Sequence, residues 1–312
     1  MIKAEGLTKE YGALTAVDNV SFKVESGEVL GFLGPNGAGK TTTMRMFAGF
    51  VQPTSGYAEI CGYRVDTRPT EAKACLGYLP EGAPSYSEMT PREFLEFIAA
   101  IRGLDAARQR ERVAEVIDRL NLGTVLEQRI ETLSKGFKRR VGLAQAILHD
   151  PPVLILDEPT DGLDPNQKHE VRELIAEMSS NKIIVISTHI LEEVDAVCNR
   201  AIIISAGRIV ADETPEALIN QSRFHNAVTL RLEHGADLSE VARELRALPD
   251  VDHVEVFEEE HSVTAFPKDK ALILTAIGDL AGERSWPLEQ LHLESGRLDE
   301  VFRRITAPET AS

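Results

Sequence analysis

The sequence predicts an α/β protein that carries a second, smaller α+β module, and three observations predict it. Over roughly the first 220 residues, short β-branched runs alternate with helical patterns, as expected of a parallel sheet covered by helices. A glycine-rich segment joins an apolar run at 29–33 to a helix. Near residue 221 the pattern changes, and the order of elements becomes that of a ferredoxin-like module. We therefore expect one domain over 1–221 and an accessory domain over 222–312.

In the first domain, local signals mark the ends of several elements. The expected strands cover 2–7, 20–24, 29–33, 153–156 and 183–187. The expected helices cover 43–49, 90–102, 106–120, 134–148 and 164–179. Thr90 begins a capping box with proline at the first helical position, and Ser134 and Asp164 are natural N-caps. The continuous apolar runs at 153–156 and 183–187 are typical of a sheet that is buried on both faces.

The accessory domain shows shorter elements in a mixed order. The expected strands cover 227–232, 253–257, 262–266 and 288–293, and the expected helices cover 238–248, 270–280 and 298–305. The acidic run at 258–260 falls between two of these strands. We expect it to be a solvated hairpin tip, since runs of like charge favour solvent.

Composition excludes some classes of function. The chain has 312 residues, 43% of them hydrophobic, and a net charge of −16. This acidity disfavours a nucleic-acid binder, which needs a basic face. The three cysteines, Cys61, Cys75 and Cys198, lack the spacing of a metal site or a C-x-x-C pair, so we expect idle thiols in a reducing cytosol. No signal peptide and no apolar run of about 20 residues is present, so we expect no direct membrane insertion.

One segment fits the P-loop pattern G-x-x-x-x-G-K-[ST] in the strand–loop–helix setting that the pattern requires. It consists of Gly34, Pro35, Asn36, Gly37, Ala38, Gly39, Lys40, Thr41 and Thr42. The glycines let backbone N–H groups surround phosphate oxygens, and the following helix adds the positive end of its dipole. Lys40 is placed to reach the β- and γ-phosphates and Thr41 to bind Mg²⁺. The segment predicts binding of a nucleoside triphosphate.

A second element supports the first. The apolar run at 153–156 ends in Asp157 and Glu158, which places two carboxylates at the end of a strand. Asp157 is suited to hold Mg²⁺ through water, and Glu158 to polarise an attacking water molecule. A strand followed by Asp-Glu is weak evidence alone, but together with an upstream P-loop it is strong.

The segment from Leu133 to Arg140 reads Leu-Ser-Lys-Gly-Phe-Lys-Arg-Arg and opens a helix with Ser134 as its N-cap. Its free N–H groups and dipole favour an anion. Here the chain resembles the nucleotide-binding subunits of ATP-binding cassette transporters, whose Leu-Ser-Gly-Gly-Gln signature stands at this place, just before the Asp-Glu strand. The resemblance covers roughly residues 1–220, with the motifs in the expected order.

The resemblance implies a role for each matching position. Tyr11 matches the aromatic residue that stacks on adenine, and Glu81 stands where the family has a glutamine that touches Mg²⁺ and the membrane partner. Ser134 and Gly136 match the signature that contacts phosphate in trans. The remaining matches are Asp157 (magnesium), Glu158 (catalysis), the loop 161–164 with Asp164 (dimer interface), and His189 (γ-phosphate switch). Together with Lys40, Glu158 and His189 are the candidate catalytic residues.

The chain departs from the family pattern at three positions. Lys135 and Phe137 replace two residues of the signature, and Glu81 replaces the glutamine. These variants resemble the ATPases of ABC-2 type exporters, including those of gliding-motility and copper-site-assembly systems, which also carry a small C-terminal module. The departures bear on the tuning of hydrolysis, whereas the residues for ATP binding are retained.

The resemblance implies an ATPase with ATP and Mg²⁺ as cofactors, working as a homodimer on a separate integral membrane permease, most often in export. It implies a cytoplasmic protein held peripherally on the inner face of the cell membrane by that permease. The alternative is a soluble ABC-type ATPase that remodels a macromolecular complex without transport. A module that binds ATP without turnover and a small-molecule kinase are weaker alternatives. The first conflicts with the intact catalytic residues, and the second leaves Ser134 and His189 without a role.

Overall fold

The computed structural model describes residues 1–82 and 86–307 and divides the chain into two compact units, Met1–Thr214 and Pro215–Ser312. The division lies before α8 (Pro215–Ile219), a helix that our boundary at residue 221 left in the first domain. Leu218 of this helix is fully buried, and α8 packs against α11 (Leu298–Thr306). The helix groups with the second unit through a contact that is remote in sequence, which local pattern does not reveal.

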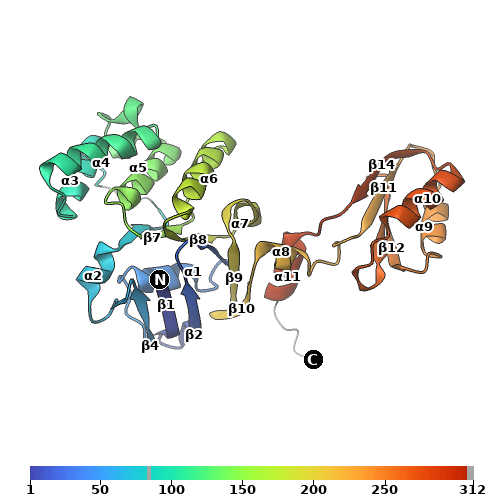
Figure 1. Cartoon of the computed structure of the whole chain (residues 1–312), viewed down its shortest axis with the longest axis horizontal. Coiled ribbons are helices and arrows are strands. Elements are labelled where there is room, and N and C mark those ends of the chain that lie inside the picture. The colour runs from blue at the N-terminus through green and yellow to red at the C-terminus, as the bar shows by residue number, and fades with distance from the viewer. Residues whose placement is uncertain (83–85, 308–312) are drawn as a thin grey trace. The chain divides into compact units, whose positions relative to one another are not determined.

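A six-stranded sheet forms the centre of the first unit (Figure 1). Its strands are, in order, β10 (Arg208–Glu213), β9 (Arg200–Ser205), β3 (Val29–Leu33), β8 (Ile183–Thr188), β7 (Val153–Asp157) and β6 (Leu76–Leu79). All neighbours pair in parallel except β10, which is antiparallel to β9. Every residue of β3, β7 and β8 is buried, as the apolar runs predicted.

A second, antiparallel sheet packs its apolar face toward the first. It consists of β2 (Leu14–Val24), β1 (Ile2–Tyr11), β4 (Ser55–Ile60) and β5 (Tyr63–Arg64). The hairpin of β1 and β2 is much longer than the strands expected at 2–7 and 20–24. Register shifts along β1, for example between Ala4 and Leu7, keep the two strands paired past that point. The core between the sheets includes Leu7, Phe32 and Ile155, and α1 (Lys40–Phe47) contributes Met44.

Four further helices of the first unit lie where the sequence predicted them: α3 (Pro91–Ile101), α4 (Ala106–Arg119), α5 (Lys135–Ile147) and α6 (Pro165–Ser179). The sequence analysis did not predict α2 (Pro69–Ala74), α7 (Leu191–Val197) or the 3₁₀ turns η1 (Gly123–Val125) and η2 (Ile130–Thr132). The capping box of Thr90 and Glu93 is present. Asp164 Oδ1 accepts from the N–H of Gln167 at 2.9 Å and caps α6. α3 and α4 pack on each other and on α5, which forms a helical subdomain (Figure 1).

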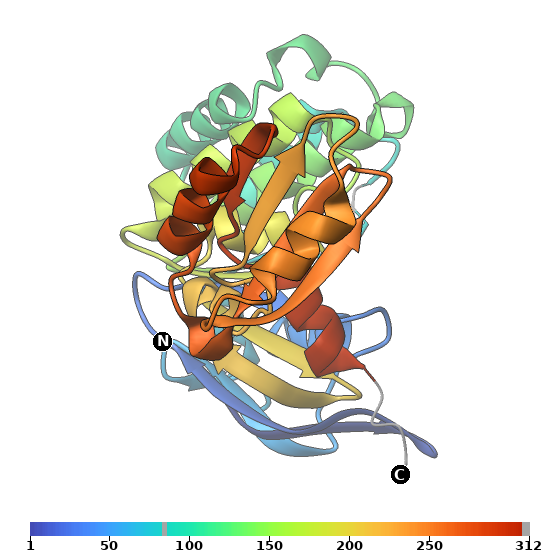
Figure 2. The ribbon, with the colours of Figure 1, turned by 90° about the vertical axis from the view of Figure 1, so that its right-hand side faces the viewer.

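The second unit contains a four-stranded antiparallel sheet with helices on one face (Figures 1 and 2). Besides α8 and α11, this unit contains β11 (Val228–Leu232), α9 (Leu238–Leu245), β12 (Val251–Phe257), β13 (Ser262–Pro267), η3 (Lys268–Lys270), α10 (Leu274–Arg284) and β14 (Leu288–Leu293). The order of elements and the strand order β12-β13-β11-β14 are those of a ferredoxin-like module. Val228, Leu230 and Ile277 contribute to its core. Within residues 1–82 and 86–307, no helix has the length and apolar character that crossing a bilayer requires.

The two compact units give a test of the domain boundary. We expect a chain that ends at Thr214 to unfold in one cooperative thermal transition, because its core lies within residues 1–214. A chain that ends at residue 221 is the matched control. It keeps α8 without α11, which exposes Leu218, so we expect it to aggregate more readily. Equal solution behaviour of the two chains, or failure of the shorter one to fold, would contradict the boundary at Thr214.

Candidate nucleotide-binding and catalytic site

The loop between β3 and α1 requires glycine at two positions. At Gly39 φ is 109°, a conformation that other residues avoid, and an added Cβ would lie 2.5 Å from the carbonyl oxygen of Ala16. At Gly34 an added Cβ would lie 2.4 Å from the carbonyl oxygen of Ile204. The backbone of the loop is therefore pressed against β2 and β9, and Pro35, Asn36 and Gly37 form its exposed part. The segment therefore has the strand–loop–helix form that the pattern requires, and its binding of phosphate stays a prediction.

Lys40 stands at the start of α1, where the helix dipole is positive. The residue is 7% exposed, and its Nζ donates to the carbonyl oxygens of Gly34 at 2.6 Å and Pro35 at 3.2 Å. Burial lowers the pKa of Lys40, and the nearby carboxylates of Glu158 and Asp157 oppose that shift. A cation is thus held inside the loop with neutral oxygens as its direct partners, where phosphate oxygens would bind it more strongly.

Asp157 ends β7 as a buried carboxylate that accepts no hydrogen bond from the part of the chain that the structure describes. The residue is 0% exposed, and neither carboxylate oxygen has a hydrogen-bond partner among the described residues. Burial raises its pKa. Thr41 Oγ1 lies 3.5 Å from Glu81 Oε2, so a hydroxyl and a second carboxylate belong to the same site. Orphaned carboxylate oxygens with a hydroxyl nearby fit Mg²⁺, which prefers one or two carboxylates together with substrate phosphates and water.

Glu158 and His189 form a direct pair. His189 Nδ1 lies 2.9 Å from Oε2 and 3.0 Å from Oε1 of Glu158. The side chain of His189 is 55% exposed and that of Glu158 is 13% exposed. Burial raises the pKa of Glu158, and His189 opposes the shift. A carboxylate with a raised pKa is a better proton acceptor, which suits a group that must polarise water. The structure therefore brings together two residues that lie 31 positions apart in the sequence.

Adjacent strands bring these groups together. β8 lies between β3 and β7, and all three run in parallel, so their carboxyl ends share one edge of the sheet. Lys40 follows β3, Glu158 follows β7 and His189 follows β8. This edge is where ligands bind in parallel α/β sheets.

The signature segment lies beside the loop that follows β7. Ser134 Oγ accepts from the N–H of Phe137 at 3.3 Å and caps α5, as predicted. Lys135 Nζ donates to Asp161 Oδ2 at 2.8 Å, and its side chain covers Gly162. An added Cβ at Gly136 would lie 2.6 Å from Gln167 Oε1, so the start of α5 packs closely on α6. The contact of Ser134 and Gly136 with a partner's nucleotide stays a prediction.

Tyr11 ends β1 with half of its surface exposed. Lys9 Nζ lies 5.1 Å from the centre of its ring, within the range of a cation–π contact. The ring is available to stack on a base, and its role in holding adenine stays a prediction.

Sequence reasoning missed two buried charged residues next to this site. Arg139 of α5 is 5% exposed and donates to the carbonyl oxygen of Pro80 at 2.8 Å. Glu193 of α7 is 2% exposed, accepts from Thr188 Oγ1 at 2.9 Å and also accepts from Thr160 Oγ1. Helical spacing carried a signal for Arg139, since it lies three residues after Gly136 and four before Leu143, on the buried face of α5.

The unpartnered carboxylate of Asp157 predicts a gain in stability on neutralisation. Because its folded-state pKa is raised, the ionised form costs folding free energy at neutral pH, and this cost disappears as the pH falls through the folded-state pKa. We expect Asp157→Asn to raise the melting temperature by a few degrees at pH 7 without nucleotide. The gain should shrink toward pH about 4, where the wild-type carboxyl also becomes neutral.

The same variant should lose most of the extra thermal stability that wild type gains from Mg²⁺ and ATP, because its amide is a poorer magnesium ligand. A lower melting temperature than wild type at pH 7 without nucleotide would contradict the electrostatic argument.

The chain is similar to transporter ATPases over nearly its whole length. The model of the ABC transporter family matches residues 17–161. The linearmycin resistance ATP-binding protein LnrL of Bacillus subtilis is 32% identical, with 98% of each chain covered. The Nod factor export ATP-binding protein I of Ralstonia nicotianae is 33% identical over 99% of this chain and 94% of that one. The daunorubicin resistance ATP-binding protein DrrA2 of Streptomyces coeruleorubidus is 33% identical over 99% and 96%.

Solved structures support the same family. An ATP-binding subunit of an ABC transporter matches with a TM-score of 0.67 at 32% identity, over 71% of this chain and 92% of that one. A dimeric ATP-binding cassette in a post-hydrolysis state, bound to ADP and Pi, has the same fold, with a TM-score of 0.64 at 23% identity over 69% and 99%. This chain belongs to the family of ABC transporter ATP-binding subunits, and it is an ATPase.

Proposed function

We propose that this ATPase works as a head-to-tail homodimer that energises a separate integral membrane permease, with export as the direction of transport. The hydrolysis that drives this cycle is supported by one observation, the meeting of Lys40, Asp157, Glu158 and His189 at the carboxyl edge of one sheet. A cation, a magnesium-type carboxylate and an acid–histidine pair are the groups that hydrolysis of a phosphoanhydride needs. A small-molecule kinase or a silent ATP-binding module would leave part of this set without a role.

Within one subunit the residues take distinct parts in hydrolysis. Lys40 exchanges the carbonyl oxygens of Gly34 and Pro35 for the β- and γ-phosphates. Thr41, Glu81 and Asp157 would hold Mg²⁺, which when bound offsets the charge that develops on the phosphates. Glu158 orients the attacking water and accepts its proton, and His189 stabilises the γ-phosphate.

The second subunit completes the site in this proposal. Ser134, Gly136 and the N-terminus of α5 would meet the γ-phosphate bound to the partner, and the loop with Asp164 would cross the interface. Because the γ-phosphate is then bound from both sides, ATP favours the closed dimer, and hydrolysis lets it open. Tyr11 would stack on the adenine of its own subunit.

A groove of about 1010 Å³ is our proposed contact surface for the permease. Phe50 and Ile101 line it and are 71% and 63% exposed, which is a large apolar surface for a subunit on its own. Arg45, Lys73 and Arg102 add positive charge, while Glu81 connects the groove to the magnesium site. An apolar groove with basic residues suits an amphipathic helix that carries acidic residues.

The proposed direction rests on relatives rather than on this chain's own residues. Three of the relatives that match nearly its whole length are named for resistance to linearmycin, resistance to daunorubicin and Nod factor export. These names support export as the direction of transport, and membership of the ABC-2 type group stays our proposal. None of the three is named for gliding motility or copper-site assembly, so we do not narrow the proposal to those systems.

Replacing Glu158 tests the dimer and the permease together. We expect Glu158→Gln to bind ATP and to hydrolyse it at least about a hundredfold more slowly, because the amide accepts no proton. The variant should accumulate as a closed dimer. Purified from native membranes with ATP in mild detergent, it should carry a stoichiometric polytopic membrane protein, identified by mass spectrometry.

The matched control is the double variant Lys40→Met with Glu158→Gln, in which loss of the loop cation should abolish both nucleotide binding and the closed dimer. Near-normal turnover in Glu158→Gln would remove Glu158 from catalysis. Recovery with soluble or ribosomal proteins only would favour the remodelling ATPase over the transporter.

The raised pKa of Glu158 predicts the shape of the pH profile. Only the carboxylate accepts a proton, so kcat should fall as the pH drops through a pKa above the ordinary value of 4.5. His189 opposes the raised pKa, so in His189→Gln the acid limb of the residual activity should move to higher pH. The measurement is kcat at saturating ATP and Mg²⁺ between about pH 5 and 8. An acid limb that stays in place or moves to lower pH would contradict the pairing.

A further inference from the structure

One buried cation links three segments of the catalytic unit. Arg139 lies in the second turn of α5, and its guanidinium donates to backbone carbonyl oxygens. Nη1 donates to Pro80 at 2.8 Å and Nε donates to Pro159 at 3.3 Å. Nη2 donates to the carbonyl oxygens of Asp157 and Glu158. A single side chain therefore joins the segment after β6 to the segment after β7.

This arrangement is unusual for a charge at that depth. Arg139 is 5% exposed, and in the described part of the chain it forms no ion pair with a carboxylate. Burial lowers its pKa, and the charges of Asp157, Asp161, Glu158 and Glu81 oppose the shift. Buried charges persist in proteins when hydrogen bonds compensate their lost hydration. Here the carbonyl oxygens supply that compensation. The guanidinium can stay buried because these carbonyl groups face it, and the guanidinium in turn holds the carbonyl groups in place.

One end of the contact fixes the backbone of Glu158. This residue has φ of 53°, in the left-handed region that glutamate rarely adopts. Its N–H donates to the carbonyl oxygen of Ser187 at 2.8 Å, and its own carbonyl oxygen accepts from Arg139. A backbone conformation of this kind persists where surrounding contacts determine it. The direction in which the Glu158 carboxylate points therefore depends on Arg139 as well as on His189.

The other end of the contact lies at the groove. Pro80 and Glu81 both line the groove that we assign to the permease, and Glu81 Oε2 lies 3.5 Å from Thr41 Oγ1. Gln145, also on α5, donates to the carbonyl oxygen of Tyr78 at 2.6 Å, so α5 holds the end of β6 at two points. A displacement of the Pro80 segment would be transmitted to the guanidinium and from there to the carbonyl oxygen of Glu158.

We propose that Arg139 is a positioning residue that ties the Pro80–Glu81 segment of the groove to the catalytic carboxylate of Glu158. Arg139 acts through Glu158 and touches no substrate. The proposal rests on the proposed function, because it takes Glu158 as the catalytic carboxylate and the groove as the permease contact. To the proposed function it adds Arg139, whose side chain directly connects the Pro80–Glu81 segment of the groove with Glu158.

The experiment compares Arg139→Met with wild type in the full-length chain. Methionine keeps most of the apolar volume and removes every donor. We expect kcat to fall by at least about tenfold, because a small misplacement of a catalytic group is costly. KM for ATP and the affinity for a fluorescent ATP analogue should change by less than about threefold, since Lys40 and the loop are untouched. Arg139→Gln keeps two N–H donors and should therefore recover part of the lost kcat. It replaces Arg139→Met in the comparison with wild type if the methionine variant folds poorly.

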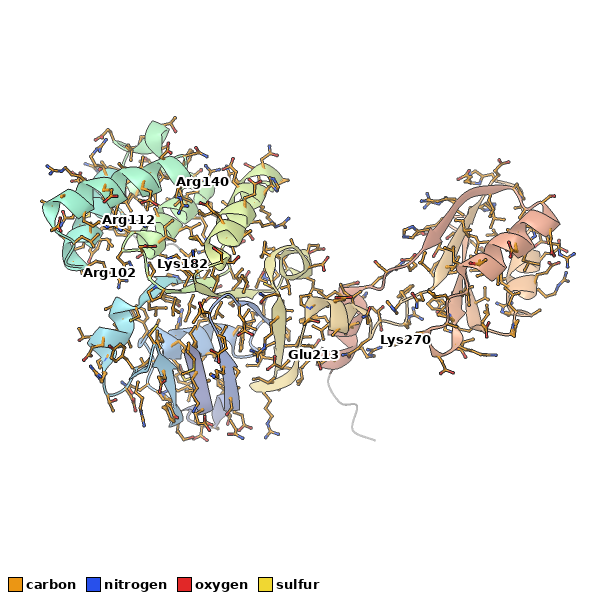
Figure 3. The ribbon with its side chains drawn as sticks, viewed as in Figure 1. Arg102, Arg112, Arg140, Lys182, Glu213 and Lys270 are labelled. Carbon is orange, nitrogen blue, oxygen red and sulfur yellow. The ribbon has the colours of Figure 1, made fainter. Side chains whose placement is uncertain are left out.

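A double variant separates positioning from a general structural effect. If Arg139 acts through Glu158, then adding Arg139→Met to Glu158→Gln should lower the residual rate by less than about twofold. The matched control is Arg112→Met on α4 (Figure 3). Arg112 is 6% exposed and donates to the carbonyl oxygens of Ile147 and Leu148 and to Glu115, outside the catalytic groups. Its loss should lower the melting temperature and leave kcat of the folded protein within about twofold.

Three outcomes would overturn the proposal: an unchanged kcat in Arg139→Met, a loss that multiplies fully with that of Glu158→Gln, or an equal loss of kcat in Arg112→Met. Failure of the proposed function has a different signature, because Glu158→Gln by itself would then turn over ATP at a near-normal rate. If Glu158→Gln loses kcat while Arg139→Met keeps the wild-type kcat, the role of Arg139 is rejected and the proposed function stands.

Discussion

The complete burial of β3, β8 and β7 in the centre of the six-stranded sheet is the constraint on which the site depends. β3, β7 and β8 have no exposed residue, and the charged groups of the site stand at the ends of these strands. Asp157 is the last residue of β7, while Glu158 and His189 directly follow β7 and β8. Neighbouring strands lie about 4.8 Å apart, which keeps residues just beyond their ends within reach of one another. The 2.9 Å contact of Glu158 with His189 follows from the pairing of β7 with β8.

The buried charges at the carboxyl edge of the six-stranded sheet cost folding free energy. Burial raises the pKa of Asp157 and Glu158 and lowers that of Lys40, so for all three groups burial outweighs the attraction of nearby opposite charge. In the function that we propose, phosphate oxygens and a divalent cation would supply the charges that these groups lack. Binding energy and folding stability are therefore linked, and a ligand that binds Asp157 and Lys40 in the folded state alone stabilises the fold by an amount that grows with the logarithm of its concentration above the dissociation constant.

Local signals in the sequence predicted local structure well. The caps at Thr90, Ser134 and Asp164 depend on contacts within three residues, and all three are present. The strand β6 is only four residues long, contains Gly77, and depends on pairing with β7, so no local pattern indicated it. The full length of the β1–β2 hairpin and the grouping of α8 with α11 depend likewise on remote partners. Pattern reasoning therefore finds strands with long apolar runs, and it misses elements whose bounds or grouping depend on remote partners alone.

The same distinction between local signals and remote contacts applies to the residues of the site. Lys40, Asp157 and Glu158 are identifiable from short motifs because their chemistry needs particular side chains next to a strand end. Arg139 contacts carbonyl oxygens, which every residue carries, so its partners leave no trace in the sequence. Only a basic residue on the buried face of a helix signals such a contact. Motifs thus reveal the groups that touch the ligand, whereas the groups that hold those in place emerge from the three-dimensional structure.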